Sequence, residues 1–300
     1  MGCGELMFKK LLKSSLFLLV LFSILASNVF SFDVPTAEHT ADSYDSLLMH
    51  LNGTDASTTM PDSSTNNAKG NATVNGNAQL DTAIVKFGTA ALLLDGTGDY
   101  INYANSVDYD FGNPAAAFTI EYWCYITDTT SYDGHITSSG NTAGNYAWVI
   151  YTNGSGVLRC DTAGITADTI TSGNQSITVN QWDHVAFICK GSGATDVNFY
   201  VNGTAGNAPG TGNKNFNSNA NGIAIGRVYH NEDSFYAVGS FDEIRISKGI
   251  ARFQSVARRI IIISYGLDIG DYREIGTPLW SCKIKALKLW KNFQWKYLRG

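Results

Sequence analysis

Short apolar segments recur through residues 45–254, and each ends in a break rich in Asn, Gly, Thr or Asp. No amphipathic helix pattern lies between them, which is typical of an all-β sandwich or barrel. Five Asn-Gly dipeptides are tight-turn signals, because Asn and Gly tolerate the positive φ of a type I′ hairpin. The apolar segments are Leu47–Leu51, Ala90–Leu94, Phe118–Ile126, Ala147–Tyr151, Val157–Cys160, Trp182–Cys189, Val197–Val201, Ile223–Gly226 and Phe241–Ser247.

Seven stretches of the chain occur in the order that one family shows. They are Leu47–Gly53, Phe87–Tyr100, Phe118–Trp123, Trp182–Ala186, Phe199–Gly203, Ile223–Gly226 and Phe241–Ile246. Through these stretches the chain resembles the laminin G-like and pentraxin-like branch of the concanavalin A-like lectin/glucanase superfamily. The resemblance implies an all-β fold over residues 45–254, a two-sheet antiparallel jelly-roll sandwich. It does not select a ligand, because this fold hosts lectins, adhesion modules, enzymes and inert spacers.

Residues 1–31 are predicted to be a secretory signal peptide. Lys9, Lys10 and Lys13 precede an apolar run, and cleavage after Ser31 fits the small residues at its end. An uncleaved membrane anchor is the alternative, although the run is short for a span. Cleavage would leave no transmembrane span and would make the protein secreted or extracellular, with the cell surface and the periplasm as alternatives. Residues 32–44 are treated as a linker.

Residues 255–300 form a tail of foreign composition, in which Lys and aromatic residues alternate without a helical or strand period. It could bind an anionic surface, serve as a docking element for a partner, or be a non-native reading frame.

Residues 33–254 hold 22 acidic and 9 basic residues, so nucleic-acid binding is not expected.

Pentraxin-like relatives bind calcium through acidic and amide side chains in two loops. The resemblance implies Asn145, Glu232 and Asp233 as candidate ligands, with a solvated polar loop as the alternative. Gly144 stands where the family has an Asp, so the paired site is not reproduced. Asp99 and the pair Asp242-Glu243 lie at family turns, where they could cap backbone N–H groups or bind a metal ion.

After signal cleavage the chain keeps Cys124, Cys160, Cys189 and Cys282. Buried free thiols and one disulfide among the first three are both open. The resemblance places the family disulfide at Glu121 and Ala186, neither of which is Cys. Cys124 and Cys189 each lie three residues after those positions. If the two strands pair antiparallel, these equal shifts place the two cysteines far from each other, so they do not replace that bond.

Enzyme signatures are absent from the sequence, including the Glu-x-Asp-x-Glu run that glucanases of this fold carry, so we expect no enzymatic activity. The predicted function is an exported binding module for a carbohydrate or a cell-surface glycan. The alternatives are a structural or protein-adhesion module of a bacterial surface or phage virion protein without a small ligand and, more weakly, a glycoside-active enzyme. Candidate ligand-binding residues in predicted loops are Tyr132, Tyr146, Tyr229 and Tyr236.

Overall fold

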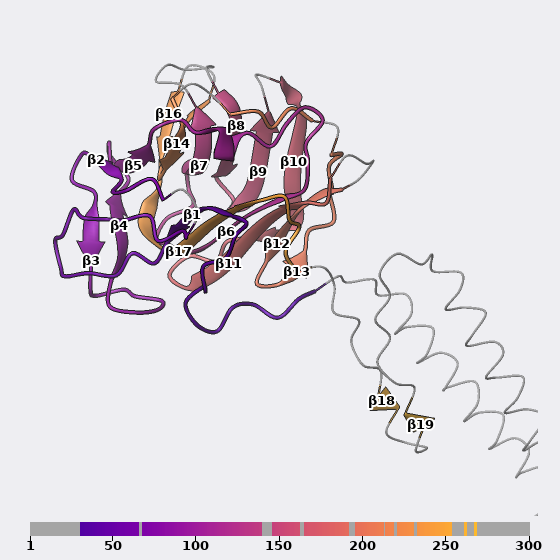
Figure 1. Ribbon diagram of the computed structural model, residues 1–300, viewed down its shortest axis with the longest axis horizontal. Coiled ribbons are helices and arrows are strands. Elements are labelled where there is room, and N and C mark those ends of the chain that lie inside the picture. The colour runs from indigo at the N-terminus through magenta and orange to yellow at the C-terminus, as the bar shows by residue number, and fades with distance from the viewer. Residues whose placement is uncertain are drawn as a thin grey trace, which may run out of the picture. The chain divides into compact units, whose positions relative to one another are not determined.

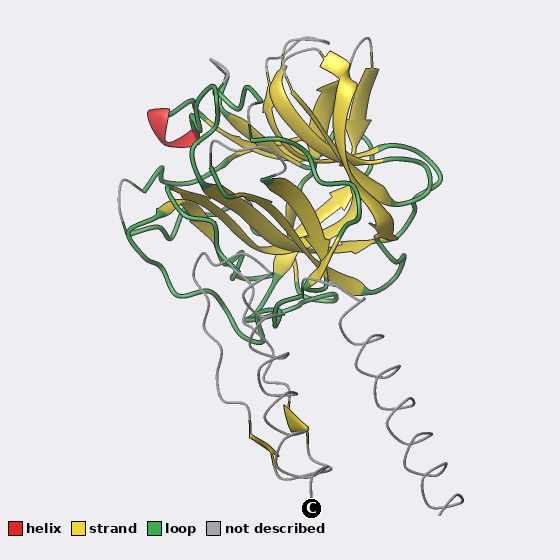
Figure 2. Cartoon of the chain, turned by 90° about the vertical axis from the view of Figure 1, so that its right-hand side faces the viewer, coloured by secondary structure: helices red, strands yellow, loops and turns green. Residues whose placement is uncertain are grey.

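The computed structural model is an all-β sandwich of two antiparallel sheets (Figures 1 and 2). This confirms the fold class that the alternating apolar and turn segments predict. The structure describes residues 31–65, 68–139, 146–162, 165–191, 196–212, 214–218, 221–230, 233–253, 261–262 and 267–268.

The first sheet has eight strands, in the order β13-β12-β11-β6-β17-β4-β3, with β1 also paired to β17. The strand β17 is long enough to hold two neighbours on one edge. Its first half pairs with β4, and its second half pairs with β1. The bounds are β1 Asp45–Met49, β3 Gln79–Asp81, β4 Ala91–Asp95, β6 Phe118–Ile126, β11 Trp182–Cys189, β12 Val197–Val201, β13 Thr204–Ala205 and β17 Val238–Lys248.

The second sheet has seven strands, in the order β10-β9-β8-β7-β14-β5-β2. A separate hairpin of β15 and β16 follows β14 along the chain, and the 3₁₀ helix η1 follows β5. The bounds are β2 Thr73–Asn75, β5 Tyr100–Tyr103, η1 Val107–Tyr109, β7 Asp133–Ser139, β8 Tyr146–Thr152, β9 Val157–Thr162, β10 Ile165–Ser176, β14 Ile223–Ile225, β15 Arg227–His230 and β16 Asp233–Tyr236.

The core lies between the two sheets and follows the two-residue period of each strand. On β6, Ile120, Tyr122 and Cys124 face the core. On β8 of the other sheet, Trp148 and Ile150 meet them, and all five side chains are fully buried. The intervening residues of each strand face outward, and these outer faces carry the polar chemistry of the domain.

Strands β6 and β11 pair in the register that the family resemblance implies. Glu121 lies directly opposite Ala186, where relatives place a disulfide. Cys124 is opposite Asp183, and Cys189 is at the far end of the same ladder, opposite Phe118. The expectation that the two cysteines lie apart is confirmed.

The cysteines Cys124, Cys160 and Cys189 are buried and free, as the thiol alternative predicts. Burial raises the pKa of each of these thiols. Because the thiolate is the reactive form, they act as small apolar side chains rather than nucleophiles. Cys282 lies outside the described residues.

The segment 32–44 lies against the outer face of the eight-stranded sheet. Phe32 is 8% exposed and stacks on Phe253, with ring centroids 4.1 Å apart and planes 13° apart. Its main-chain N–H donates to the carbonyl of Gly203 at 2.9 Å. Gly203 has φ +75° and ends an Asn-Gly turn in which Asn202 has φ +48°, as a type I′ turn requires. A Cβ at Gly203 would collide with the Phe32 carbonyl, so this glycine also makes room for the segment.

Residues 1–254 and 255–300 form two compact units by their internal contacts. In the second unit the structure describes only a short antiparallel pair, β18 (Ile261–Ile262) with β19 (Leu267–Asp268). No helix among the described residues has the length and apolar character that crossing a bilayer requires.

Candidate functional site

The hairpin β15–β16 lies on the outer face of the seven-stranded sheet. Val228 of β15 and Phe235 of β16 pack on Val149 and Tyr151, the outward-facing residues of β8. The hairpin comes this close because the neighbouring strand carries Gly134. A Cβ at Gly134 would collide with the Phe235 carbonyl and the Val228 amide nitrogen. The backbone of the hairpin therefore packs directly against the backbone of β7 at Gly134.

An exposed aromatic ring stands beside this hairpin. Tyr132, in the turn just before β7, is 44% exposed. Its ring stacks on Phe235, with centroids 4.9 Å apart and planes 25° apart. On another side it meets the ring of Tyr151 at 5.9 Å. These two contacts fix the ring orientation while leaving part of it open to solvent.

Polar groups continue along the same outer face, on β9. The hydroxyl of Tyr151 donates to Oδ2 of Asp161 at 2.9 Å, and both side chains are buried. Burial, followed by the Asp161 charge, raises the pKa of Tyr151 far above its usual range. Arg159 lies directly opposite Tyr151 in the β8–β9 ladder and is half-buried. A fixed aromatic ring, a carboxylate and a guanidinium therefore share one sheet face.

The structure describes the side chains of two of the four predicted binding tyrosines and separates these two. Tyr132 and Tyr236 lie near the hairpin but on opposite sides of it, because Tyr236 follows Phe235 and successive strand residues point to opposite faces. Tyr236 is half-buried, and its ring centroid lies 6.4 Å from that of Tyr100. Tyr146 begins β8 and Tyr229 lies in β15, so neither is in the loop that the sequence predicts. The side chains of these last two are not described.

Arg227 accounts for the surroundings of Tyr236. Its guanidinium carbon lies 4.4 Å from the ring centroid of Tyr100 and 5.9 Å from that of Tyr236. Only 7% of Arg227 is exposed, and desolvation lowers its pKa. This cation–π cluster ties the hairpin to β5. Tyr236 therefore has a packing role in the described part of the chain.

The predicted calcium ligands fall largely outside the described residues. Asn145 and Glu232 are not described, and Asp233 begins β16 with its side chain undescribed. No group of three or more His, Cys, Asp or Glu residues within the described ranges could hold a metal ion. The calcium site stays a prediction.

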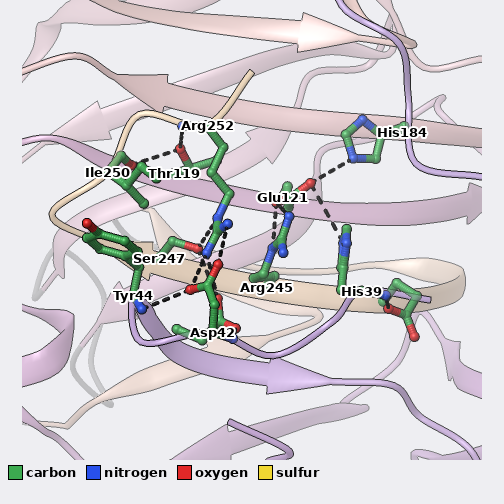
Figure 3. A network of polar contacts seen from close by, with 12 residues as sticks. His39, Asp42, Tyr44, Thr119, Glu121, His184, Arg245, Ser247, Ile250 and Arg252 are labelled. Carbon is green, nitrogen blue, oxygen red and sulfur yellow. Dashed lines mark hydrogen bonds and ion pairs between the residues drawn. The ribbon is translucent and has the colours of Figure 1, made fainter. Parts of the chain in front are cut away.

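A buried ionic network lies on the outer face of the other sheet (Figure 3). Glu121 of β6 is fully buried, and its Oε1 accepts the Nε–H of Arg245 at 2.7 Å. His184 Nε2 lies 3.3 Å and His39 Nε2 lies 3.7 Å from Glu121 Oε2. Although burial opposes ionisation, the His184 hydrogen bond and the neighbouring cationic groups lower the pKa of Glu121 to about 2. Glu121 is thus an ionised structural anchor.

The neighbouring carboxylates are also enclosed. Glu243 is fully buried at a β-bulge with φ +48°, where it accepts the His39 N–H at 2.7 Å and contacts His50 Nδ1 at 2.8 Å. Asp242 accepts two backbone N–H groups at 3.0 Å each, from Lys86 and Phe87. These carboxylates are bound to partners inside the domain, where no substrate reaches them.

Asp99 also caps backbone groups, which bears out the capping alternative for both family-turn aspartates. Its Oδ1 accepts the Asn77 N–H at 2.7 Å, and its Oδ2 accepts the Asp95 N–H at 3.1 Å. The side chain is 1% exposed. Hydrogen bonding therefore explains why this acidic residue is buried.

Sequence reasoning missed Phe235, Tyr151, Arg159 and Asp161. The signal for Tyr151 was present, because it ends an alternating apolar segment two residues before the Asn153-Gly154 turn. The strand β16 gave no comparable signal, since its four residues DSFY hold one apolar side chain. From the sequence, an outward-facing arginine such as Arg159 cannot be distinguished from a solvated strand residue without a function. The grouping of these side chains is visible only once the hairpin is placed.

The stacked antiparallel sheets define a lectin-like β-sandwich. The chain belongs to the concanavalin A-like lectin/glucanases superfamily, because the Laminin_G_3 family model matches residues 95–255, more than half of its length. The resemblance stated from the seven sequence stretches is confirmed. No curated protein matches the chain significantly.

Solved structures with a similar fold include binding domains of larger proteins. Domain 4 of an extracellular arabinanase from Geobacillus stearothermophilus, solved with arabinotriose, is 21% identical, with a TM-score of 0.46 over 66% of this chain and 89% of that one. The binding domain of botulinum neurotoxin serotype G is 14% identical (TM-score 0.48, 69% of this chain, 48% of that one). The binding domain of Paraclostridial Mosquitocidal Protein 1 is 16% identical (TM-score 0.49, 69% and 49%).

Proposed function

We propose that this protein is an exported, non-enzymatic carbohydrate-binding module whose ligand lies on the outer face of the seven-stranded sheet, against Tyr132. The observation that carries the proposal is the exposed Tyr132 ring, held in one orientation by Phe235. A fixed aromatic face beside polar groups suits a sugar ring, which has an apolar face and hydroxyl groups at its rim. Sites for small ligands commonly combine such apolar surfaces with a few placed polar groups.

The absence of a catalytic role is part of this proposal. Three carboxylates on the strands β6 and β17, Glu121, Asp242 and Glu243, are fully buried and bound to partners within the domain. Glycoside hydrolysis needs two carboxyl groups on either side of the scissile bond. Such a pair has to be accessible to the sugar, and these three are not.

Export is inferred from the sequence of residues 1–31 and remains a proposal. Cleavage after Ser31 would make Phe32 the first residue of the secreted chain, and Phe32 is buried against Phe253. A new terminus there would still be held by the sheet. Intact-mass measurement of exported protein is the test, and a full-length product retained in membranes would contradict cleavage.

The binding proposal is tested on a glycan array and by titration calorimetry with Tyr132→Ala. Tyr44 provides a matched control, because it is 45% exposed but lies just before β1, in the segment that covers the other sheet. We expect Tyr132→Ala to weaken binding about tenfold or more, since a stacked aromatic contributes on the order of 1–3 kcal/mol. Tyr44→Ala should bind as the parent does.

Two results would overturn the proposal. Equal binding by Tyr132→Ala and the parent would move the ligand to another face. Absence of binding to every glycan would favour the alternative, a structural or protein-adhesion module without a small ligand.

A further inference from the structure

Arg159 is the one arginine of β1–β17 without a bonding partner among the described residues. Arg245 is paired with Glu121, Arg252 with Asp42, and Arg227 lies over aromatic rings. The Arg159 side chain has no hydrogen bond or ion pair to any described residue, and its Nε is buried. A half-buried guanidinium without an acceptor is costly, because it loses water without gaining a protein partner.

This is unexpected in an acidic domain. Residues 33–254 hold 22 acidic residues against 9 basic ones, so carboxylate partners are plentiful. The nearest along the strand, Asp161, is 1% exposed and already accepts the hydroxyl of Tyr151. Arg159 therefore remains available to an acceptor from outside the chain.

The position of Arg159 links it to the proposed binding face. Strands β7, β8 and β9 are neighbours in the sheet, and Tyr151 of β8 is opposite Arg159 while its ring meets that of Tyr132. Neighbouring strands lie about 4.8 Å apart, so Arg159 and the start of β7 are separated by roughly 10 Å. A disaccharide resting on Tyr132 is long enough to span this distance to the guanidinium.

We propose that the ligand is an acidic saccharide whose carboxylate is bound by Arg159 while a sugar ring rests on Tyr132. This inference rests on the proposed function and adds the chemical class of the ligand. The planar guanidinium matches a carboxylate with two parallel hydrogen bonds, which a neutral hydroxyl does not offer. Only the Nε of Arg159 is buried without a partner, so its terminal nitrogens are the ones that a ligand can reach.

The experiment compares carboxylated glycans with uncharged counterparts of the same ring structure. The probes are oligogalacturonate and its methyl ester, and sialyllactose and its methyl ester, each titrated against the full chain. We expect the carboxylated form to bind at least tenfold more tightly, because hydrogen bonds to charged groups are worth on the order of 1.5–3 kcal/mol.

Variants assign the preference to a residue. Arg159→Gln should remove the preference for the acidic member of each pair. Arg159→Lys should retain part of the preference, because it keeps the charge but loses the two-pronged geometry. Lys190→Gln is the matched control, since it removes one positive charge next to β11 in the other sheet.

The outcomes separate the two proposals. Binding of neutral and acidic members with equal affinity, or a preference that survives Arg159→Gln, would overturn the acidic-ligand inference and leave the carbohydrate module standing. Absence of binding to all four probes and to a wider array would overturn both. A preference lost equally in Lys190→Gln would show a general charge effect and would also overturn the role of Arg159.

Discussion

Arg245 donates its Nε–H to the fully buried carboxylate of Glu121 at 2.7 Å, at the centre of the face that residues 32–44 cover. Removing one member of a buried ion pair leaves the other charge without compensation. We therefore expect Arg245→Met to lower the free energy of unfolding by about 3–5 kcal/mol in urea denaturation at pH 7.

The double variant Glu121→Leu/Arg245→Met is the control for that prediction, because it removes both charges and should recover much of the loss. Equal destabilisation by the single and double variants would contradict it. The Glu121 pKa of about 2 lies below its ordinary value of 4.5. The stabilisation from its ionised form is present above pH 4.5 and is lost as the pH falls toward 2.

Phe32 and Phe253 should stabilise the domain jointly. Each ring covers the other at 4.1 Å on the outer face of the eight-stranded sheet. We expect Phe32→Ala to cost roughly 2–4 kcal/mol, at or just below the range of buried aromatic truncations. A double-mutant cycle with Phe253→Ala should give a coupling energy of about 0.5–1.5 kcal/mol. Additive losses would show that the two rings act independently.

Asp133 should make stability fall as the pH rises. Burial, together with the Asp128 charge, raises its pKa to about 7 from an ordinary value of 3.8. The folded state then binds the proton more strongly than the unfolded state, so this contribution is present below pH 4 and disappears as the pH rises through 7. The parent should lose free energy of unfolding between pH 5 and pH 8, and Asp133→Asn should lose about 1–3 kcal/mol less over the same interval.

The exposed residue Asp128 offers the control for Asp133. Asp128→Asn removes a like charge and should lower the pKa of Asp133, so the pH dependence should shrink without vanishing. Urea denaturation at pH 5 and pH 8 measures all three proteins. An Asp133→Asn variant with the same pH dependence as the parent would contradict the assignment.

Calcium binding by Asn145, Glu232 and Asp233 is tested by thermal melts in EDTA and in excess calcium. We expect weak, roughly millimolar binding and a raised melting temperature, because calcium at about 100 times its dissociation constant adds roughly 2.7 kcal/mol. Glu232→Ala and Asp233→Ala should abolish the increase. An unchanged melting temperature of the parent would exclude the site, and an increase that survives both substitutions would move it elsewhere.

The sequence predicts the sandwich well where strands are apolar and long. The ranges predicted for Phe118–Ile126, Trp182–Cys189 and Val197–Val201 coincide with β6, β11 and β12. These strands are buried along nearly their whole length, so a run of apolar residues marks where each strand begins and ends. The polar strand β10, by contrast, ends in the residues TSGNQS, which read as a turn.

The candidate site is predicted only in part, for a related reason. Tyr132 was selected as a loop aromatic, and the structure gives its orientation through Phe235. The hairpin β15–β16 is not among the predicted apolar segments, because it lies outside the core and has little apolar character. Tyr236 is predicted to be a loop residue, but it lies in β16, where its side chain points to the face opposite to that of Phe235. Tertiary placement, rather than residue type, decides these cases.

The seat of the hairpin on Gly134 has a consequence for how the binding face can change. At that point the hairpin meets β7 through its own backbone, with the Phe235 carbonyl and the Val228 amide nitrogen nearest to the glycine. This contact depends on the absence of a side chain on β7 and not on the identity of those on the hairpin. Outward-facing hairpin residues can therefore be exchanged without disturbing the sandwich. The sandwich is in this respect a fixed support for the hairpin, and grafting new hairpin sequences above Gly134 is the natural way to vary the proposed glycan site.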